Sequence, residues 1–133
     1  EGAGTCWAAS PYADGSWENG VREAFTKLAD LMEPVREALR DVYPSRSYPT
    51  AEGSTLSSLP HGVVATRQTD DTVEYIHVLN PPGGPTLALP APADGKRFTS
   101  ATLLADGAAV QLEQNANGLR LTLPETHRWQ ILN

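Results

Sequence analysis

The chain has 133 residues, of which 40% are hydrophobic and 20% are charged, and its formal net charge at pH 7 is −6. This length can bury the core of one ordinary domain, and the composition is globular. The negative charge argues against a nucleic-acid partner, because neutralising phosphates requires clustered Lys and Arg. No apolar run approaches the roughly 18 residues of a membrane span. We therefore expect neither nucleic acid nor a membrane as partner.

The first element in chain order is a short apolar run over residues 4–10, ended by Pro11 and Asp14-Gly15. This pattern is typical of a strand buried on both faces. Cys6 lies within it, where a small buried thiol is common. A nucleophilic cysteine would need a histidine or a helix N-terminus beside it, and the neighbouring sequence supplies neither.

The second element is an amphipathic helix, or two such helices, between about residues 17 and 42, because apolar residues recur there at three- and four-residue intervals. They are Val21, Phe25, Leu28, Leu31, Met32, Val35, Leu39 and Val42. We expect Ser16 or Asn19 to cap the helix. The negative charges of Glu18 and Glu23 would be stabilised by the positive N-terminal end of the helix dipole. Pro34 predicts a kink or break around residues 32–34, because proline removes a backbone donor and clashes with the preceding turn.

Residues 44–60 hold three prolines and no periodicity, so we expect a linker. After it, short alternating runs and turn dipeptides over residues 61–133 predict an antiparallel β-sandwich of about seven strands. The expected strands cover residues 62–68, 72–80, 86–89, 99–104, 109–114, 119–123 and 129–132. The predicted fold class is therefore α+β, with a terminal strand and helix in residues 1–43, the linker, and the sandwich.

The last hairpin has the clearest pattern. Asp106-Gly107 and Asn117-Gly118 are strong turn signals. Between and after them, apolar and polar residues alternate, as in Leu119-Arg120-Leu121. This alternation predicts a hairpin with one buried face and one wet face.

The usual catalytic signatures are missing from the sequence. His61, His77 and His127 are not at metal-ligand spacing, so we expect no metal and no cofactor. Most carboxylates fall in turns or on the helix face, where solvation explains them. A glycosidase requires two carboxyl groups about 5 to 9 Å apart, and the spacing nominates no such pair. We therefore expect no catalytic residue in this chain.

Aromatic residues gather near the end of the first strand, at Trp7, Tyr12 and Trp17. Aromatic faces stack on pyranose rings in sugar sites, whereas core packing is the competing interpretation. Trp129, in the last expected strand, is most simply a core residue.

Two stretches resemble the C-terminal part of the α-L-fucosidase family of retaining glycoside hydrolases. Residues 4–17, Gly-Thr-Cys-Trp-Ala-Ala-Ser-Pro-Tyr-Ala-Asp-Gly-Ser-Trp, resemble its last barrel strand, where an apolar run leads into Asn-Val-Gly-Pro, two residues, and then Asp-Gly and a helix. The tail resembles the family's C-terminal sandwich in its order of Leu103-Leu104, Gly107, Val110, Gly118-Leu119 and Leu123-Pro124. Ala8 and Ser10 stand where the family pattern has Asn and Gly, which leaves the glycan open.

The resemblance implies a (β/α)₈ barrel with its active site at the C-terminal strand ends, followed by this sandwich. The nucleophilic Asp and the acid/base of the family would then lie upstream of residue 1. The parent would hydrolyse O-glycosyl bonds through a covalent glycosyl-enzyme intermediate, and this chain alone would be inactive. Its partners would be the upstream barrel and, through the parent protein, the glycan. Only Trp7, Ser10 and Tyr12 would border the binding site.

Independently of the resemblance, the apolar residues 4–10 favour a truncated parent protein, unless the strand and helix pack on the sandwich instead. A fully apolar parallel strand needs neighbours on both edges, and one strand and one helix cannot close a barrel of about 250 residues. Two other functions stay open. One is a free-standing carbohydrate-binding sandwich that holds a glycan without cleaving it, and the other is a protein-interaction domain.

Overall fold

The structure, a computed structural model, describes residues 10–50, 58–125 and 127. Within these residues, an α-helix and a 3-10 helix precede two antiparallel sheets. The elements are α1 (Val21–Met32), η1 (Glu33–Ala38), β1 (Val42–Pro44), β2 (Val63–Gln68), β3 (Glu74–Val78), β4 (Thr86–Leu89), β5 (Ala101–Thr102), β6 (Ala109–Asn115) and β7 (Gly118–Thr122). The predicted α+β class is confirmed.

Helix α1 begins after Gly20, whose left-handed φ of 85° closes the preceding turn. No side chain caps this helix, so the predicted caps Ser16 and Asn19 are wrong. The Ser16 hydroxyl instead donates to Asp14 Oδ1 at 2.6 Å, inside a turn that ends before the helix starts. Glu23 does lie in the first turn, where its negative charge interacts favourably with the positive N-terminal end of the helix dipole.

The helical segment changes geometry at the predicted proline. α1 ends at Met32, and η1 continues as a 3-10 helix with Pro34 in its first turn, where the missing N–H of proline costs least. The helix does not extend to Val42, so its predicted end is wrong. Asp41 adopts a left-handed φ of 55°, and the chain turns there into β1.

The first sheet has the order β1-β2-β3 and is antiparallel throughout. Val63 and Ala65 of β2 are buried and lie opposite Val78 and Ile76 of β3, so these residues share the inner face. Strand β1 was not predicted. Its three residues include a proline, which sheets accept at an edge, and β1 is indeed an edge strand.

The second sheet has the order β4-β7-β6-β5. Its β6–β7 hairpin closes with Asn115 opposite Gly118. Leu119 and Leu121 are buried and Arg120 is exposed, which confirms the predicted alternation. Strand β5 is shorter than predicted, because the Leu103 N–H donates to the Ala108 carbonyl at 2.8 Å and the chain turns back there.

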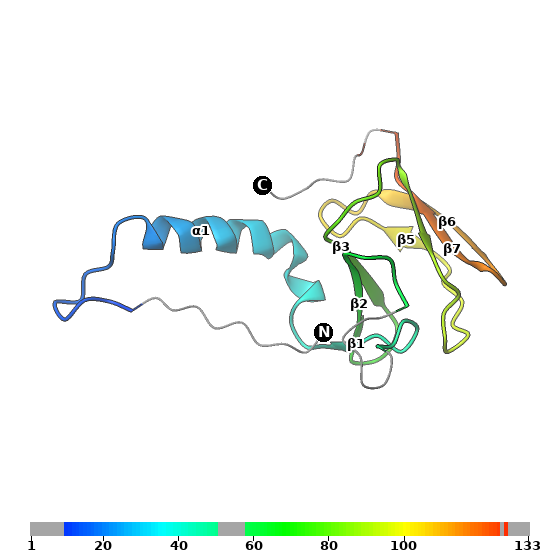
Figure 1. The fold of residues 1–133 in the computed structure, drawn as a ribbon, viewed down its shortest axis with the longest axis horizontal. Coiled ribbons are helices and arrows are strands. Elements are labelled where there is room, and N and C mark those ends of the chain that lie inside the picture. The colour runs from blue at the N-terminus through cyan, green and yellow to red at the C-terminus, as the bar shows by residue number, and fades with distance from the viewer. Residues whose placement is uncertain (1–9, 51–57, 126, 128–133) are drawn as a thin grey trace.

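The two sheets, whose arrangement is drawn in Figure 1, share residues of one hydrophobic cluster. Its buried members are Tyr48, Leu59, Val63, Ala65, Leu87, Leu89, Leu119 and Leu121. Tyr48 and Leu59 come from residues 44–60, which were expected to be a linker. This segment therefore contributes to the packed structure, because its apolar side chains fill the space between the sheets.

Helix α1 extends away from the sheets in Figure 1, and none of its residues is buried. Contact with the first sheet is made by η1, where Ala38 is buried and its carbonyl accepts a hydrogen bond from Thr66 at 3.4 Å. The expected strand over residues 129–132 lies outside the described residues. The expected first strand does too, apart from Ser10, which is not in a strand.

Candidate functional site

The inner face of the first sheet ends in a row of polar side chains. Arg67 lies opposite Tyr43 of β1 and opposite Glu74 of β3 in the strand register. It follows Val63 and Ala65 at two-residue steps, so its side chain points to the same inner face. The hydrophobic core therefore gives way to charged groups at this end of the sheet.

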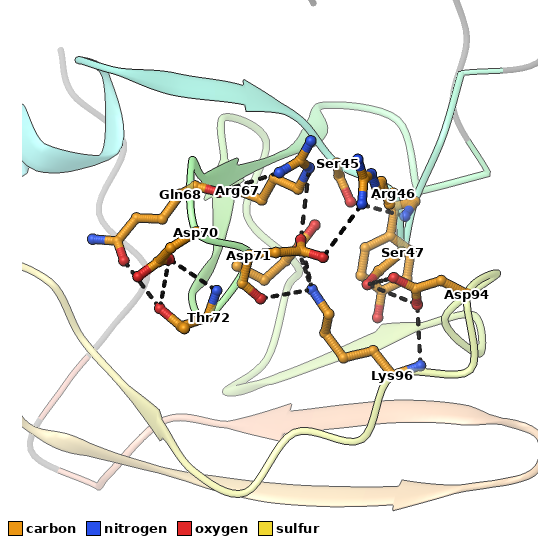
Figure 2. A network of polar contacts seen from close by, with 12 residues as sticks. Ser45, Arg46, Ser47, Arg67, Gln68, Asp70, Asp71, Thr72, Asp94 and Lys96 are labelled. Carbon is orange, nitrogen blue, oxygen red and sulfur yellow. Dashed lines mark hydrogen bonds and ion pairs between the residues drawn. The ribbon is translucent and has the colours of Figure 1, made fainter.

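Asp71, in the β2–β3 turn, is the centre of an ion-pair cluster (Figure 2). Its carboxylate lies 3.1 Å from Lys96 Nζ, 3.6 Å from Arg67 Nε and 3.7 Å from a guanidinium nitrogen of Arg46. The hydrogen bond from Lys96 holds the pKa of Asp71 below its ordinary value, with help from the charges of Lys96, Arg67 and Arg46 and against the effect of burial. The carboxylate is thus held ionised.

Two loops are fastened to this cluster. The Ser47 hydroxyl donates to the Asp94 carboxylate, with both oxygens at 3.1 Å. The Ala93 N–H donates to the Ser47 carbonyl at 2.7 Å, and the Lys96 N–H donates to Asp94 Oδ1 at 3.0 Å. Figure 2 shows these residues side by side, although they lie far apart in sequence.

Glu74 and Tyr48 are deeply buried polar members of the cluster, as is Ser47. The Glu74 side chain is 2% exposed, and Tyr48 is 1% exposed. Neither Glu74 oxygen nor the Tyr48 hydroxyl has a hydrogen bond of good geometry within the described structure. Glu74 forms an ion pair with Lys96, whose Nζ lies 3.7 Å from Oε2. Such groups are costly, because water is lost without full replacement.

Burial raises the pKa of the Glu74 carboxyl above its ordinary value. The Ser45 hydroxyl and Lys96 oppose this shift, while the negative charges of Asp94 and Asp71 add to it. Burial also raises the pKa of Tyr48 to about 12, and the charges of Glu74 and Asp94 contribute. The tyrosine is therefore neutral at physiological pH.

The chemistry of the cluster is that of a balanced ionic network. Arg46, Arg67 and Lys96 face the carboxylates of Asp71, Glu74 and Asp94. Glu74 is too buried to touch a substrate. Across the described residues, no group of three or more His, Cys, Asp or Glu side chains is placed to hold a metal ion. The carboxyl groups of the cluster can bind and release protons, and its hydrogen bonds and ion pairs can hold loops together.

A second polar network lies on the outer face of the first sheet. The Tyr75 hydroxyl donates to Glu37 Oε1 at 3.0 Å and accepts from Gln68 Nε2 at 2.9 Å, which ties η1 to β2 and β3. His77 Nε2 lies 3.0 Å from the Thr66 hydroxyl, and burial lowers the pKa of His77. This network explains His77 as a neutral structural residue.

Of the binding residues expected from sequence, the two that the structure describes, Ser10 and Tyr12, are not brought to either network. Trp7 lies outside the described residues. Ser10 and Tyr12 are exposed, Tyr12 by 56%, and their segment lies at the end of α1 farthest from the sheets (Figure 1). The Tyr12 N–H donates to the Ser16 carbonyl at 2.7 Å, which fixes a local turn. Their role at a glycan site stays a prediction.

The cluster was missed by sequence reasoning, although one signal was available. Glu74 has the same strand parity as Ile76 and Val78, and Arg67 has that of Val63 and Ala65. A charged residue on an apolar strand face indicates a buried pair. The contributions of Asp71 and Lys96 had no such signal, because they come from loops 25 residues apart.

A surface hollow lies where the turn of residues 81–85 meets the end of β7 and the start of β6. It is lined by Pro81, Pro82, Gln111, Leu123 and Pro124, among others. Its lining, as far as the structure describes it, contains neither an aromatic side chain on which a sugar could stack nor a pair of carboxylates. The hollow therefore does not resemble a glycosidase site.

Helices α1 and η1 together carry an apolar stripe, in which Leu31 and Met32 are exposed and Leu28 and Val35 are half-buried. Leu28, Leu31, Met32 and Val35 recur at helical spacing, so they lie on one side. Leu31 is 49% exposed and Met32 is 41% exposed. We refer to these four residues as the apolar stripe. No helix in the described part of the chain is long and apolar enough to cross a membrane.

Comparison with known proteins gives no family to which this chain can be assigned. No family model matches the sequence, and no curated protein matches it either.

Proposed function

We propose that the two sheets form the β-sandwich of an accessory domain in a fucosidase-like glycoside hydrolase, and that α1 joins this domain to an upstream (β/α)₈ barrel. The chain itself has a structural role and no activity. The parent hydrolyses O-glycosyl bonds by the retaining mechanism of that family.

The apolar stripe is the observation that carries this proposal. Burying the exposed half of Leu31 and of Met32 against another surface would stabilise the protein by about 1 kcal/mol per side chain. An amphipathic helix is stable in a folded protein chiefly because its apolar side packs. The motif order around residues 4–17 supports a barrel as that surface, because the helix directly follows the segment that resembles a barrel strand.

The first experiment compares the 133-residue chain with a protein that also carries the upstream residues. The short chain is expected to release no product from an aryl α-L-fucoside, whereas the longer protein releases it. In the longer protein, the amides of α1 are expected to exchange more slowly, because the stripe is packed. Turnover by the short chain, or equally fast α1 exchange in both proteins, would contradict the proposal.

Matched substitutions locate the contact on the helix. Leu31→Ser with Met32→Ser is expected to restore fast α1 exchange in the longer protein. Asp30→Ser is the control, since Asp30 is exposed and lies on the polar side of the same turn. If both changes act alike, the stripe is not the contact surface.

The alternative function is a non-catalytic carbohydrate-binding module. It is favoured by Tyr43, which is 54% exposed on the edge strand β1 and whose ring is backed by the Arg67 guanidinium, 5.2 Å from the ring centroid. One face of this ring is held rigid and the side chain reaches solvent. Glycan binding by the short chain that is lost in Tyr43→Ala would favour this alternative over the structural role.

A further inference from the structure

Residues 93–98 lie in the loop between β4 and β5 of the second sheet and make contacts with both sheets, and we call them the crossing segment. On the first sheet's side, Lys96 Nζ donates to the Asp71 carbonyl at 3.3 Å and to its carboxylate at 3.1 Å. On the other side, Gln114 Nε2 of β6 donates to the Lys96 carbonyl at 2.7 Å, and the Phe98 N–H donates to Gln114 Oε1 at 2.9 Å. Lys96 therefore links both sheets.

The carboxyl groups of Glu74 and Asp71 compete for the ammonium group of Lys96. The Lys96 Nζ to Glu74 Oε2 distance is 3.7 Å, longer than a hydrogen bond, whereas the Asp71 contact is a true hydrogen bond. An ionised Glu74 is thus a buried charge whose compensation is incomplete. Protonation of Glu74 would remove this desolvation cost, and the ammonium group of Lys96 would then pair with the Asp71 carboxylate alone.

Several described segments near Glu74 contribute a titratable or charged group, or a hydroxyl, to this balance. Arg67 faces it from β2, Asp71 from the β2–β3 turn, and Asp94 and Lys96 from the loop before β5. Tyr48 and Ser45 approach from the loop after β1, and Arg46 acts on Asp71.

We propose that Glu74 is a proton-binding site that controls how firmly the crossing segment is held between the two sheets. Uptake of one proton neutralises the buried carboxyl. The ammonium group of Lys96 then pairs with Asp71 alone, and this contact holds the segment. Release of the proton leaves a buried carboxylate that draws on the same ammonium group and favours opening of the segment.

The pH range follows from two shifts of opposite sign. The pKa of Glu74 is raised above 4.5, so its favourable contribution is complete below 4.5 and is lost as the pH rises through the pKa of the folded state. The pKa of Asp71 is lowered below 3.8, so its contribution is complete above 3.8 and is lost as the pH falls. The segment is therefore held best in mildly acidic solution.

The test is amide exchange of Ala93 and Phe98 in the 133-residue chain, corrected for the intrinsic effect of pH. Between pH 4.5 and about pH 8, their protection is expected to fall, because the raised pKa of Glu74 makes its contribution to holding the segment disappear as the carboxyl ionises. In Glu74→Gln, which keeps the shape and removes the charge, protection is expected to stay level and to exceed the wild type at the higher pH.

Asp71→Asn is the matched control. It is expected to lower protection across this pH range and to weaken the dependence due to Glu74, because the Asp71 charge adds to the Glu74 shift and its loss frees Lys96 for Glu74. Wild-type protection that does not vary with pH, or a Glu74→Gln chain with the same pH dependence as wild type, overturns the proposal.

A second measurement needs no variant. The ¹³C shift of the Glu74 carboxyl in the wild-type chain should titrate with a midpoint above 4.5, and a midpoint at or below that value also overturns the proposal.

Discussion

Tyr48 combines favourable packing with an unfavourable polar group. Its ring belongs to the core shared by the two sheets, and burial of an aromatic ring is strongly stabilising. Its hydroxyl is buried without a hydrogen bond to any described residue, which costs about 1 to 3 kcal/mol. Since the pKa of Tyr48 is raised to about 12, the cost arises from lost hydration and not from charge.

Tyr48→Phe is therefore expected to leave the free energy of unfolding unchanged or to raise it by up to about 1 kcal/mol, measured by urea denaturation. Tyr48→Ala is the comparison, and its expected cost is about 3 to 5 kcal/mol because the ring itself is lost. A clear loss of stability in Tyr48→Phe would show that the hydroxyl is hydrogen-bonded in solution.

Among the elements, the β6–β7 hairpin depends on one glycine. Gly118 lies in the turn opposite Asn115, and a Cβ built there would overlap the carbonyl oxygen of Leu89 in the neighbouring β4. That oxygen belongs to the backbone, so it cannot move aside without disturbing the pairing of β4 with β7.

Gly118→Ala is expected to lower the free energy of unfolding by about 2 kcal/mol or more, through overlap with β4 and strain at its positive φ. Gly84→Ala is the control, because nothing lies within 4 Å of a Cβ at Gly84. It should stay within about 0.5 kcal/mol of wild type. Thermal unfolding of the two variants measures this difference. Equal stability of the two variants would mean that β4 and β7 lie farther apart than described.

Local patterns predicted the elements whose signals are local. Strand β4 has the predicted bounds, and Pro34 lies at the change from α1 to η1. Strand β1 could not be predicted, because a three-residue strand containing proline has no periodicity and forms only through pairing with β2. The polar cluster needed the tertiary fold, because Ser47 and Asp94 are 47 residues apart.

At the scale of the whole molecule, the packing has two unequal parts. The two sheets share one core and are linked by the crossing segment, whereas α1 buries none of its residues. Proteins open locally where few apolar groups are buried. The sheets should therefore unfold together, and α1 should open at a much lower free energy.

Leu121→Ala tests this division, since Leu121 of β7 is buried in the shared core. Its expected cost is about 2 to 5 kcal/mol, which corresponds to a fall of about 30-fold or more in the protection of the slowest amides. The fall should be equal in β2 and β7, because one core stabilises both sheets, while α1 amides should be unaffected. Leu31→Ala on α1 is the control and should leave both sheets within about 0.5 kcal/mol. Loss of protection confined to β4, β6 and β7 would instead show that the sheets fold independently.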